Sequence, residues 1–256
     1  MGYMKLYKIV IGCVIIVIVI VGCHKKKNSE DMASAIVTKS IEASGGNRIN
    51  NATITFQFRD RSYKATRNNG SFVLERSFQD STNVIADRLS NDGFKRYVNG
   101  QLQNIQDSIA AKYSSSVNSV HYFSVLPYGL NDDAVNQEYL GQTLLNGNEY
   151  YKIKITFDEL GGGDDFEDVF IYWIDKESYK VDYLAYSFHV NGGGLRFRKA
   201  FNERYIEGIR FVDYENYKPK FEGSKLLELE EMFDQDKLDL LSRIELKNVQ
   251  VLLNKK

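Results

Sequence analysis

The spacing of the hydrophobic residues changes along this chain from a helical period to a strand period. Near the start, Met32, Ile36 and Ala43 recur at helical intervals, and Gly45-Gly46 follow them. Residues spaced in this way share one face of a helix, and paired glycines favour a helix end. The pattern therefore predicts an amphipathic helix that stops at the two glycines.

A strand period of two begins directly after these glycines. Four hydrophobic residues alternate with polar ones and share one face: Ala52, Ile54, Phe56 and Phe58. Such alternation is typical of a half-buried strand. Further alternating runs predict strands at residues 63–66, 72–78, 84–89 and 94–98. Because Asn69-Gly70 and Asn99-Gly100 suit type I′ turns, we expect these strands to form an antiparallel meander with tight hairpins.

A helical pattern interrupts the alternation, which then resumes. Between Ser108 and Leu126 the apolar residues return to intervals of three and four, and Pro127 ends this predicted helix. More strands are predicted at residues 138–144, 151–157, 169–174, 181–190, 195–201 and 206–213. A short helix and a closing strand complete the pattern, at residues 226–233 and 240–247.

These elements predict an α+β protein with one large curled antiparallel sheet, a half-barrel, which about three helices cover. A flat sheet of roughly a dozen strands would expose long edges that invite aggregation, so it must curl, close or be covered. No linker rich in proline or serine interrupts the pattern, since the two prolines are Pro127 and Pro219. We therefore expect a single domain.

The start of the chain has the layout of a bacterial lipoprotein signal peptide. Lys5 and Lys8 precede an apolar run from Ile9 to Val21, and Gly22-Cys23 follow it. A positive start, a short apolar core and a small residue before the cut are typical of secretory signals. We predict cleavage after Gly22 and a lipid on the Cys23 sulfur. The predicted organisation is a signal peptide, a lipidated tether and one domain, at residues 1–22, 23–31 and 32–256.

Two other interpretations of this segment were weighed. An uncleaved transmembrane helix needs roughly 20 apolar residues, and Lys8 and Lys25 bound a shorter run. Cleavage before Cys13 would leave less apolar core than the roughly 7 to 15 residues of a signal peptide. Lipidation at Cys23 would anchor the protein to a membrane without spanning it. We expect the outer membrane, on its periplasmic side rather than at the cell surface.

Composition excludes several classes of function. The chain has 33 basic and 34 acidic side chains, and this balance suggests no nucleic-acid partner. The sequence contains 2 cysteines. Removal of Cys13 with the signal peptide and acylation of Cys23 would leave no free thiol, which excludes disulfides, thiolate metal sites and cysteine nucleophiles.

An acidic loop is the weak candidate for a metal site. Four carboxylates follow three glycines, at Asp164, Asp165, Glu167 and Asp168. These oxygen ligands could hold a hard cation such as Ca²⁺, but their spacing does not match an EF-hand. We favour a solvated acidic turn that pairs with Arg196 or Arg198, and we expect no metal and no cofactor.

We find no catalytic motif in the sequence. His121 and His189 lie outside any metal-binding spacing, and we expect both to be structural. His189 could meet a carboxylate across the sheet as an acid–base pair, but one histidine without located carboxylates is not a catalytic site. The sequence also lacks a nucleophile elbow, a P-loop and a dinucleotide fingerprint. The protein is therefore expected not to be an enzyme.

Several segments combine glycine, aromatic and charged residues in a specific order. They include the glycine-rich acidic loop at 161–168, Tyr172-Trp173-Ile174, Gly193-Gly194-Leu195-Arg196-Phe197-Arg198 and Asp213-Tyr214-Glu215-Asn216-Tyr217. This series resembles an uncharacterised family of Bacteroidota lipoproteins, over nearly the whole mature chain, and implies no known activity. In fold, such proteins are similar to the Lol lipoprotein carriers and receptors, half-barrels whose helix-covered concave face accommodates acyl chains. Fold alone does not imply function.

The resemblance and the aromatic content favour the binding of a hydrophobic ligand. Aromatic residues, 15 Phe and 17 Tyr among them, usually pack a core, but in a curled sheet they can line a cavity. We expect a cavity for a lipid or other hydrophobic ligand, lined by Tyr113, Val117, Val120, Phe56 and Phe58. Arg196 and Arg198 are the candidates for binding a head group. Two alternatives stay open, namely a structural or protein-interaction module of the cell envelope and an enzyme that uses carboxylates on an envelope glycan or lipid.

Overall fold

The computed structural model describes residues 29–163, 165–189 and 192–254. In this part of the chain, fourteen strands form two seven-stranded antiparallel sheets, accompanied by three helices and short 3-10 turns. The predicted signal peptide, Cys23 and the first part of the predicted tether lie outside the described residues. Residues 29–31, which we assigned to the tether, already belong to the first helix, which extends to residue 43.

The first sheet contains the N-terminal strands and the last strand of the chain, in the order β14-β1-β2-β3-β4-β5-β6. Its strands are β1 (Ala52–Phe58), β2 (Arg61–Asn68), β3 (Ser71–Asp80), β4 (Asn83–Ser90), β5 (Gly93–Val98), β6 (Gln101–Leu102) and β14 (Lys247–Leu253). A 3-10 helix, η1 (Gly46–Asn51), leads into it. The predicted face of β1 is confirmed, because its four hydrophobic side chains are buried and Gln57 is exposed. Asn69 and Asn99 have φ angles of 45° and 51°, as the predicted hairpins require.

The second sheet runs in the order β13-β12-β11-β10-β9-β8-β7. Its strands are β7 (Val135–Leu145), β8 (Asn148–Phe157), β9 (Val169–Asp175), β10 (Val181–Phe188), β11 (Gly194–Ile206), β12 (Ile209–Pro219) and β13 (Leu238–Ile244). Its middle is covered on both faces, and so four consecutive residues of β9, Ile171 to Ile174, are buried.

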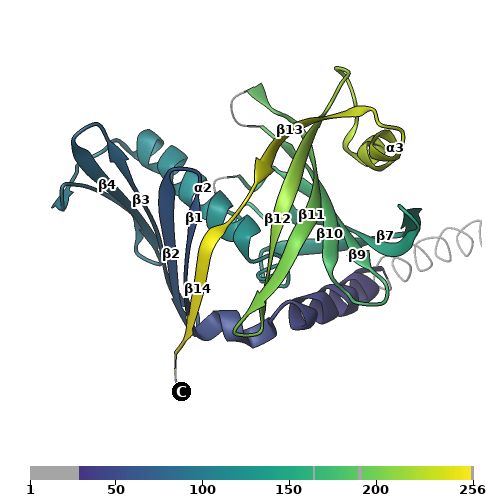
Figure 1. Cartoon of the computed structure of the whole chain (residues 1–256), viewed down its shortest axis with the longest axis horizontal. Helices are drawn as coiled ribbons and strands as arrows, with labels where there is room; N and C mark the ends of the chain where they lie inside the picture. The colour runs from purple at the N-terminus through teal and green to yellow at the C-terminus, as the bar shows by residue number, and fades with distance from the viewer. Residues whose placement is uncertain (1–28, 164, 190–191, 255–256) are drawn as a thin grey trace, which may run out of the picture.

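Three helices cover these sheets from different sides (Figure 1). The helix at residues 29–43 and α2 (Asp107–Ser124) contribute to the core between the sheets, through Val37 and Phe123 among others. The short η3 (Leu226–Glu228) and α3 (Leu229–Asp234) instead cover the opposite face of the second sheet, where Leu229 packs in a cluster with Trp173 and Phe197. None of the described helices is both long and apolar enough to cross a membrane.

The chain passes from the second sheet to the first between β13 and β14. The buried Asp213 carboxylate accepts hydrogen bonds at this seam from the Leu246 amide (2.9 Å), Asn202 Nδ2 (2.6 Å) and Arg204 Nη2 (3.1 Å). Arg204 also donates to the Leu246 carbonyl oxygen at 2.7 Å. These bonds fix the crossover, which allows β14 to pair with β1 across the register Ala52 to Leu253.

Two predicted boundaries are wrong. The strand that was expected to end at residue 201 continues as β11 to Ile206, and the hairpin lies at Glu207-Gly208 with φ angles of 50° and 74°. The register between β11 and β12 shifts in this stretch, and this irregularity hides the alternation. The predicted closing strand is two strands, since β13 ends at Ile244 and β14 begins at Lys247. A second register shift lies within β13, where Leu241 is the extra residue.

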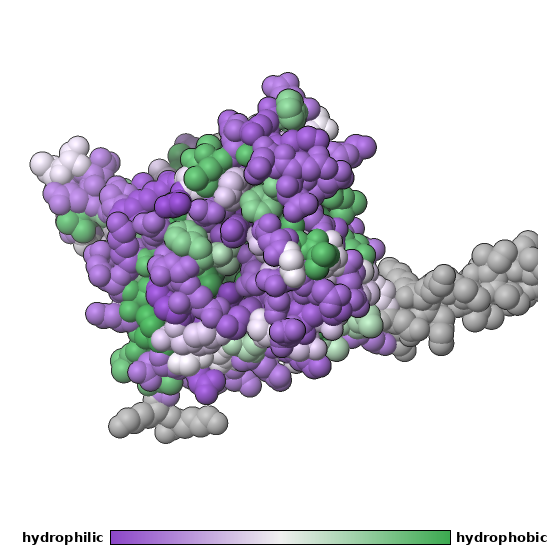
Figure 2. Space-filling model, turned by 45° about the vertical axis from the view of Figure 1, so that its right-hand side comes forward, coloured by the Kyte–Doolittle hydropathy of each residue, from purple (hydrophilic) through white to green (hydrophobic). Residues whose placement is uncertain are grey.

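The predicted fold class is confirmed as α+β, with the antiparallel strands curled into a half-barrel that does not close. The pairing divides the expected single sheet into two, which splay apart and are joined by the crossover into β14 (Figure 1). On the face in Figure 2, most of the surface is hydrophilic, and hydrophobic residues form several small groups, one of them in the hollow between the two halves.

Candidate functional site

Helix α2 presents two different faces to its surroundings. Its apolar side chains, Val117, Val120 and Phe123, are buried in the cores. An adjacent face carries Ser114, Asn118 and His121 at helical intervals of four and three, together with Ser115 and Tyr122, and lines a cavity instead. We call this cavity the α2 pocket.

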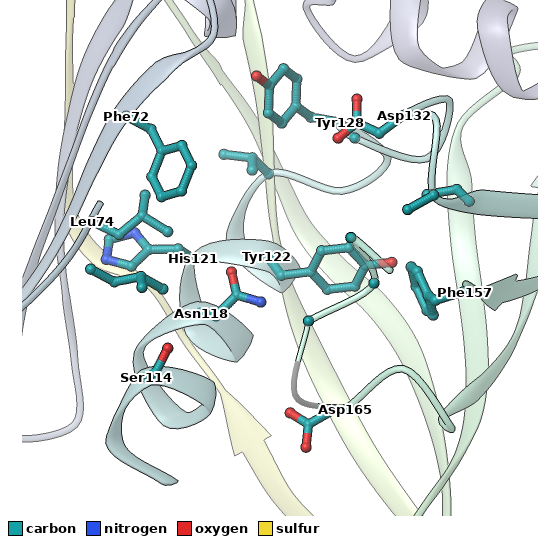
Figure 3. A pocket seen from close by; sticks show the side chains of 18 of the residues that line it. Phe72, Leu74, Ser114, Asn118, His121, Tyr122, Tyr128, Asp132, Phe157 and Asp165 are labelled. Carbon is teal, nitrogen blue, oxygen red and sulfur yellow. The ribbon is translucent and has the colours of Figure 1, made fainter. Parts of the chain in front are cut away.

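The α2 pocket lies between the helix, the first sheet and the loops that flank the second sheet (Figure 3). Its volume is about 540 Å³. The first sheet contributes Arg67, Phe72, Leu74 and Leu89. The opposite wall comes from the segment after α2, the start of β7, the end of β8 and the glycine-rich loop, with Val125, Tyr128, Asp132, Val135, Phe157, Gly161, Gly162, Gly163 and Asp165. The lining therefore combines aromatic and aliphatic walls with polar and charged groups from α2 and the loops. Sites for small organic ligands combine apolar walls with polar groups in the same way.

His121 and Tyr122 extend from α2 toward opposite walls of the pocket (Figure 3). His121 lies toward the first sheet, where its Nε2 is 3.0 Å from the Glu75 carbonyl oxygen and donates to it. Its Nδ1 is buried and has no hydrogen-bond partner among the described residues. Burial lowers the pKa of His121 to about 3, with a further contribution from the nearby Arg67 and Arg76. The ring is therefore neutral at physiological pH.

Tyr122 extends toward Phe157 and the second sheet (Figure 3). Its hydroxyl oxygen is 2.8 Å from that of Tyr172, a fully buried residue of β9. Burial raises the pKa of both phenols, so neither is an acid at neutral pH. The pair joins the helix to the second sheet and forms a side of the pocket.

The acidic loop meets the pocket at the lower end in Figure 3, where Asp165 lies. The Asp165 carboxylate accepts a hydrogen bond from the Ser115 hydroxyl. Asp168 lies 3.6 Å from Nδ1 of His189, and burial together with the charge of Asp165 raises its pKa to about 6. The structure thus places a carboxylate beside His189, at a largely exposed site.

The loop offers little for a metal ion. Glu167 is exposed, and Asp164 lies outside the described residues. The described part of the chain contains no cluster of three or more residues that could hold a metal. The described residues also form no ion pair between the acidic loop and Arg196 or Arg198, the two partners that we favoured.

Arg196 and Arg198, the predicted head-group residues, lie on β11 outside the pocket lining. Arg198 donates from Nη2 to the Tyr186 hydroxyl at 2.7 Å, and its guanidinium lies 5.1 Å from the centre of the Phe123 ring. Arg196 donates to the Leu195 carbonyl oxygen at 2.8 Å and lies over the Phe188 ring. Both guanidinium groups are therefore occupied by partners within the second sheet and α2.

The five predicted cavity residues also lie outside the lining of the α2 pocket. Phe56 is buried and stacks on Tyr63 with ring centres 5.2 Å apart, and Phe58 packs edge-on against Phe123. Val120 belongs to the same core, whereas Val117 packs directly behind the pocket wall in a cluster with Leu74. Tyr113 lies further along α2, with the Arg96 guanidinium 3.4 Å from the centre of its ring.

A buried charged network fastens α2 to the first sheet. Asp87 of β4 is almost fully buried and receives Arg76 Nη2 at 2.6 Å and Arg96 Nε at 2.6 Å. Arg76 also donates from Nη1 to the Ser116 hydroxyl of α2 at 2.7 Å. Because every member has a partner, the network holds the helix in a fixed position beside the pocket.

The sequence analysis missed Arg67, although a signal for it exists. Tyr63, Ala65 and Arg67 alternate on the core-facing side of β2, so a charged residue occupies a position where the pattern expects an apolar one. Such a conflict between pattern and residue is typical of functional positions. The polar face of α2 was missed for a different reason, because we looked for the cavity among the apolar residues of that helix.

A second cavity, of about 890 Å³, lies beside the N-terminal helix. Its lining is mainly polar and charged, including Ser29, Asp133, Asn136, Glu138 and Lys154. It has few of the apolar walls of the α2 pocket, which is therefore the better candidate for an organic ligand.

Comparison with solved structures finds chains of similar topology at low sequence identity. A LolA superfamily protein from Nitrosomonas europaea is 11% identical, with a TM-score of 0.49 over 88% of this chain and 94% of that chain. A putative outer membrane lipoprotein-sorting protein domain from Vibrio parahaemolyticus is 8% identical, with a TM-score of 0.47 and the same coverage. A DUF1329 family protein from Desulfovibrio piger is 10% identical, with a TM-score of 0.43 over 88% of this chain and 95% of that one.

Comparison with curated proteins finds no match to this sequence. A family model, by contrast, matches residues 10–246, which is most of the chain. The expected resemblance to an uncharacterised family is thereby confirmed, while an origin in Bacteroidota is not tested. The protein belongs to a family of unknown function, DUF6503.

Proposed function

We propose that this protein binds a lipid or another hydrophobic ligand in the α2 pocket, without catalysing a reaction on it. The observation that carries the proposal is the pocket itself, a cavity of about 540 Å³ between α2 and the half-barrel. Cavities of about 300–1,000 Å³ with mainly apolar walls are the usual sites for small organic ligands. Phe72, Leu74, Leu89 and Phe157 supply such walls here.

Two further features support binding rather than catalysis. The neutral His121 and the un-ionised Tyr122 are poor acids and bases at neutral pH, because burial shifts the pKa of each away from that range. The buried residues Phe56, Val117 and Val120, which we expected to line the cavity, form or adjoin the cores beside α2. We propose that they hold the pocket walls in place rather than contact the ligand.

The binding proposal is tested with an apolar fluorescent probe and a charge placed in the wall. Leu89 is half-buried and its cross-strand neighbours are the apolar Leu74 and Phe94, so Leu89→Glu keeps its carboxylate in contact with water when the pocket is empty. An acyl chain would remove that water, and an unpaired buried charge is strongly unfavourable. We expect Leu89→Glu to weaken binding of cis-parinaric acid at least tenfold while the melting temperature changes little.

The matched control is Leu144→Glu, because Leu144 is exposed on β7 outside the pocket. Equal binding by the wild type and both variants would place the ligand elsewhere. If the delipidated wild-type protein takes up no acyl probe at tens of micromolar, the binding proposal is wrong, and the interaction-module alternative replaces it.

We also propose that the protein is an envelope lipoprotein, attached to the outer membrane through a lipid on Cys23 and facing the periplasm. The support is the signal layout in the sequence, which lies outside the described residues. In cells fed labelled palmitate, Cys23→Ala should abolish labelling and leave the precursor uncut, whereas Cys13→Ala should change neither. Labelling that persists in Cys23→Ala would contradict the assignment.

A further inference from the structure

Arg67 differs from the other strongly buried arginines of the described chain. Arg76 and Arg210 each bind a carboxylate at 2.6 Å. Arg67 is 8% exposed, yet its side chain forms no hydrogen bond or ion pair with any residue that the structure describes. Its Nη1 is fully buried without a partner. An unpaired buried cation is strongly unfavourable, so a residue of this kind needs a reason.

The side chain of Arg67 lines the α2 pocket and lies over the aromatic ring of Tyr128. Its guanidinium carbon lies 5.3 Å from the centre of that ring. The Tyr128 hydroxyl donates to Asn50 Oδ1 at 2.8 Å, which fixes the ring. A guanidinium group carries its donors in one plane, and that plane matches a carboxylate or a phosphate.

Charges elsewhere in the pocket give it a direction. Tyr128 lies at the upper end in Figure 3, whereas Asp165 lies at the opposite end. Asp132 also lies at the upper end, beside Tyr128 (Figure 3), and it does not pair with the buried Nη1 of Arg67. Arg67 is the one Lys or Arg side chain in the described lining, so an anionic group is attracted toward it and repelled from the end at Asp165.

We propose that the ligand is an anionic amphiphile whose carboxylate or phosphate group binds Arg67, with its hydrocarbon chain along Phe72, Leu74 and Leu89. This inference rests on the proposed function and adds the charge and the orientation of the ligand. It also explains why an arginine occupies a core-facing position of β2, because the ligand supplies the partner that the described chain lacks.

The test compares an anionic probe with its neutral analogue on the delipidated full-length protein. A charge-assisted hydrogen bond contributes enough that its loss weakens binding by about 10- to 100-fold. Arg67→Met should therefore weaken binding of cis-parinaric acid by that factor and change binding of its methyl ester by less than about twofold. Arg67→Lys should restore part of the affinity for the acid. Hexadecyl phosphate and palmitate are then compared as competitors of bound cis-parinaric acid. The one that displaces the probe at the lower concentration carries the anionic group that the site prefers.

Two controls separate this role from a structural one. Arg88→Met removes an exposed arginine of the first sheet outside the pocket and should leave both probes unaffected. Without ligand, Arg67→Met should melt no lower than the wild type, because it removes an unpaired buried charge. If Arg67→Met melts lower than the wild type and its affinities for the acid and for the ester fall equally, Arg67 has a structural role and the inference is overturned. Equal binding of acid and ester by the wild type would overturn it too, while leaving lipid binding intact; failure of every probe would remove both proposals.

Discussion

His121 should make the stability of this protein fall as the solution becomes acidic. The folded pKa of about 3 lies below the ordinary value of 6.5, so the unfolded chain takes up a proton that the folded protein refuses. The corresponding stability is fully present above pH 6.5 and is lost as the pH falls toward 3. One pKa unit corresponds to about 1.4 kcal/mol. The loss is therefore about 2 kcal/mol at pH 5 and approaches about 5 kcal/mol near pH 3.

The geometry accounts for this shift. The ring is 1% exposed, lies edge-on against the stacked rings of Phe56 and Tyr63, and has arginines rather than carboxylates among its charged neighbours. Protonation would add an uncompensated cation beside Arg67 and Arg76, with one ring nitrogen already committed to a backbone carbonyl.

The assay is urea unfolding of the wild type and of His121→Gln at pH 7 and pH 5. Asp132 and Asp168 have raised pKa values and contribute pH dependence of the opposite sign, but they are present in both proteins. The difference in unfolding free energy between the two proteins should therefore shrink by about 2 kcal/mol from pH 7 to pH 5. Parallel pH profiles for the two proteins would refute the reasoning.

Three further substitutions test the packing. Phe56→Ala should lower the free energy of unfolding by about 3–5 kcal/mol through the cavity it leaves, and Gln57→Ala by less than about 0.5 kcal/mol; equal melting shifts would mean that the register of β1 is wrong. Asp87→Ala should lower the free energy of unfolding by about 3–5 kcal/mol, because it leaves two arginines without their buried partner. The control Arg88→Ala should lower it by under about 1 kcal/mol, and similar values for the two variants in urea titrations would contradict the network. Gly45→Ala should lower the free energy of unfolding by more than about 1 kcal/mol, because φ at this position is 124° and the new Cβ would lie 3.0 Å from the β12 backbone. An unchanged melting temperature would contradict this close approach of the two backbones.

Local signals in the sequence were sufficient for much of the fold. The faces of β1 follow from side-chain alternation, and the hairpins at Asn69 and Asn99 follow from the positive φ that their turns need. Alternation fails at the register shifts along β11 and β13, because an extra residue transfers the following side chains to the other face. The pairing of β14 with β1 is a contact between the two ends of the chain, which no local pattern encodes.

The candidate site was harder to predict, because its lining does not follow the hydrophobic pattern. Apolar residues such as Val117 enter the core, and the face of α2 that lines the pocket carries Ser114, Asn118 and His121. A search for a lipid cavity among the most apolar positions therefore identifies the packing behind the walls. The polar residue at a buried strand position, Arg67, is the better indicator, and it is visible in the sequence once β2 has been assigned.

The position of β14 also restricts when the protein can fold. This strand is made after the other thirteen described strands, yet it pairs with β1 and closes the edge of the first sheet. While the chain is being synthesised, β1 lacks one of its two neighbours, and the sheet cannot be completed until residues 247–253 emerge. Until then, the unpaired edge of β1 can pair with a strand of another chain, so the unfinished protein is exposed to aggregation at this edge.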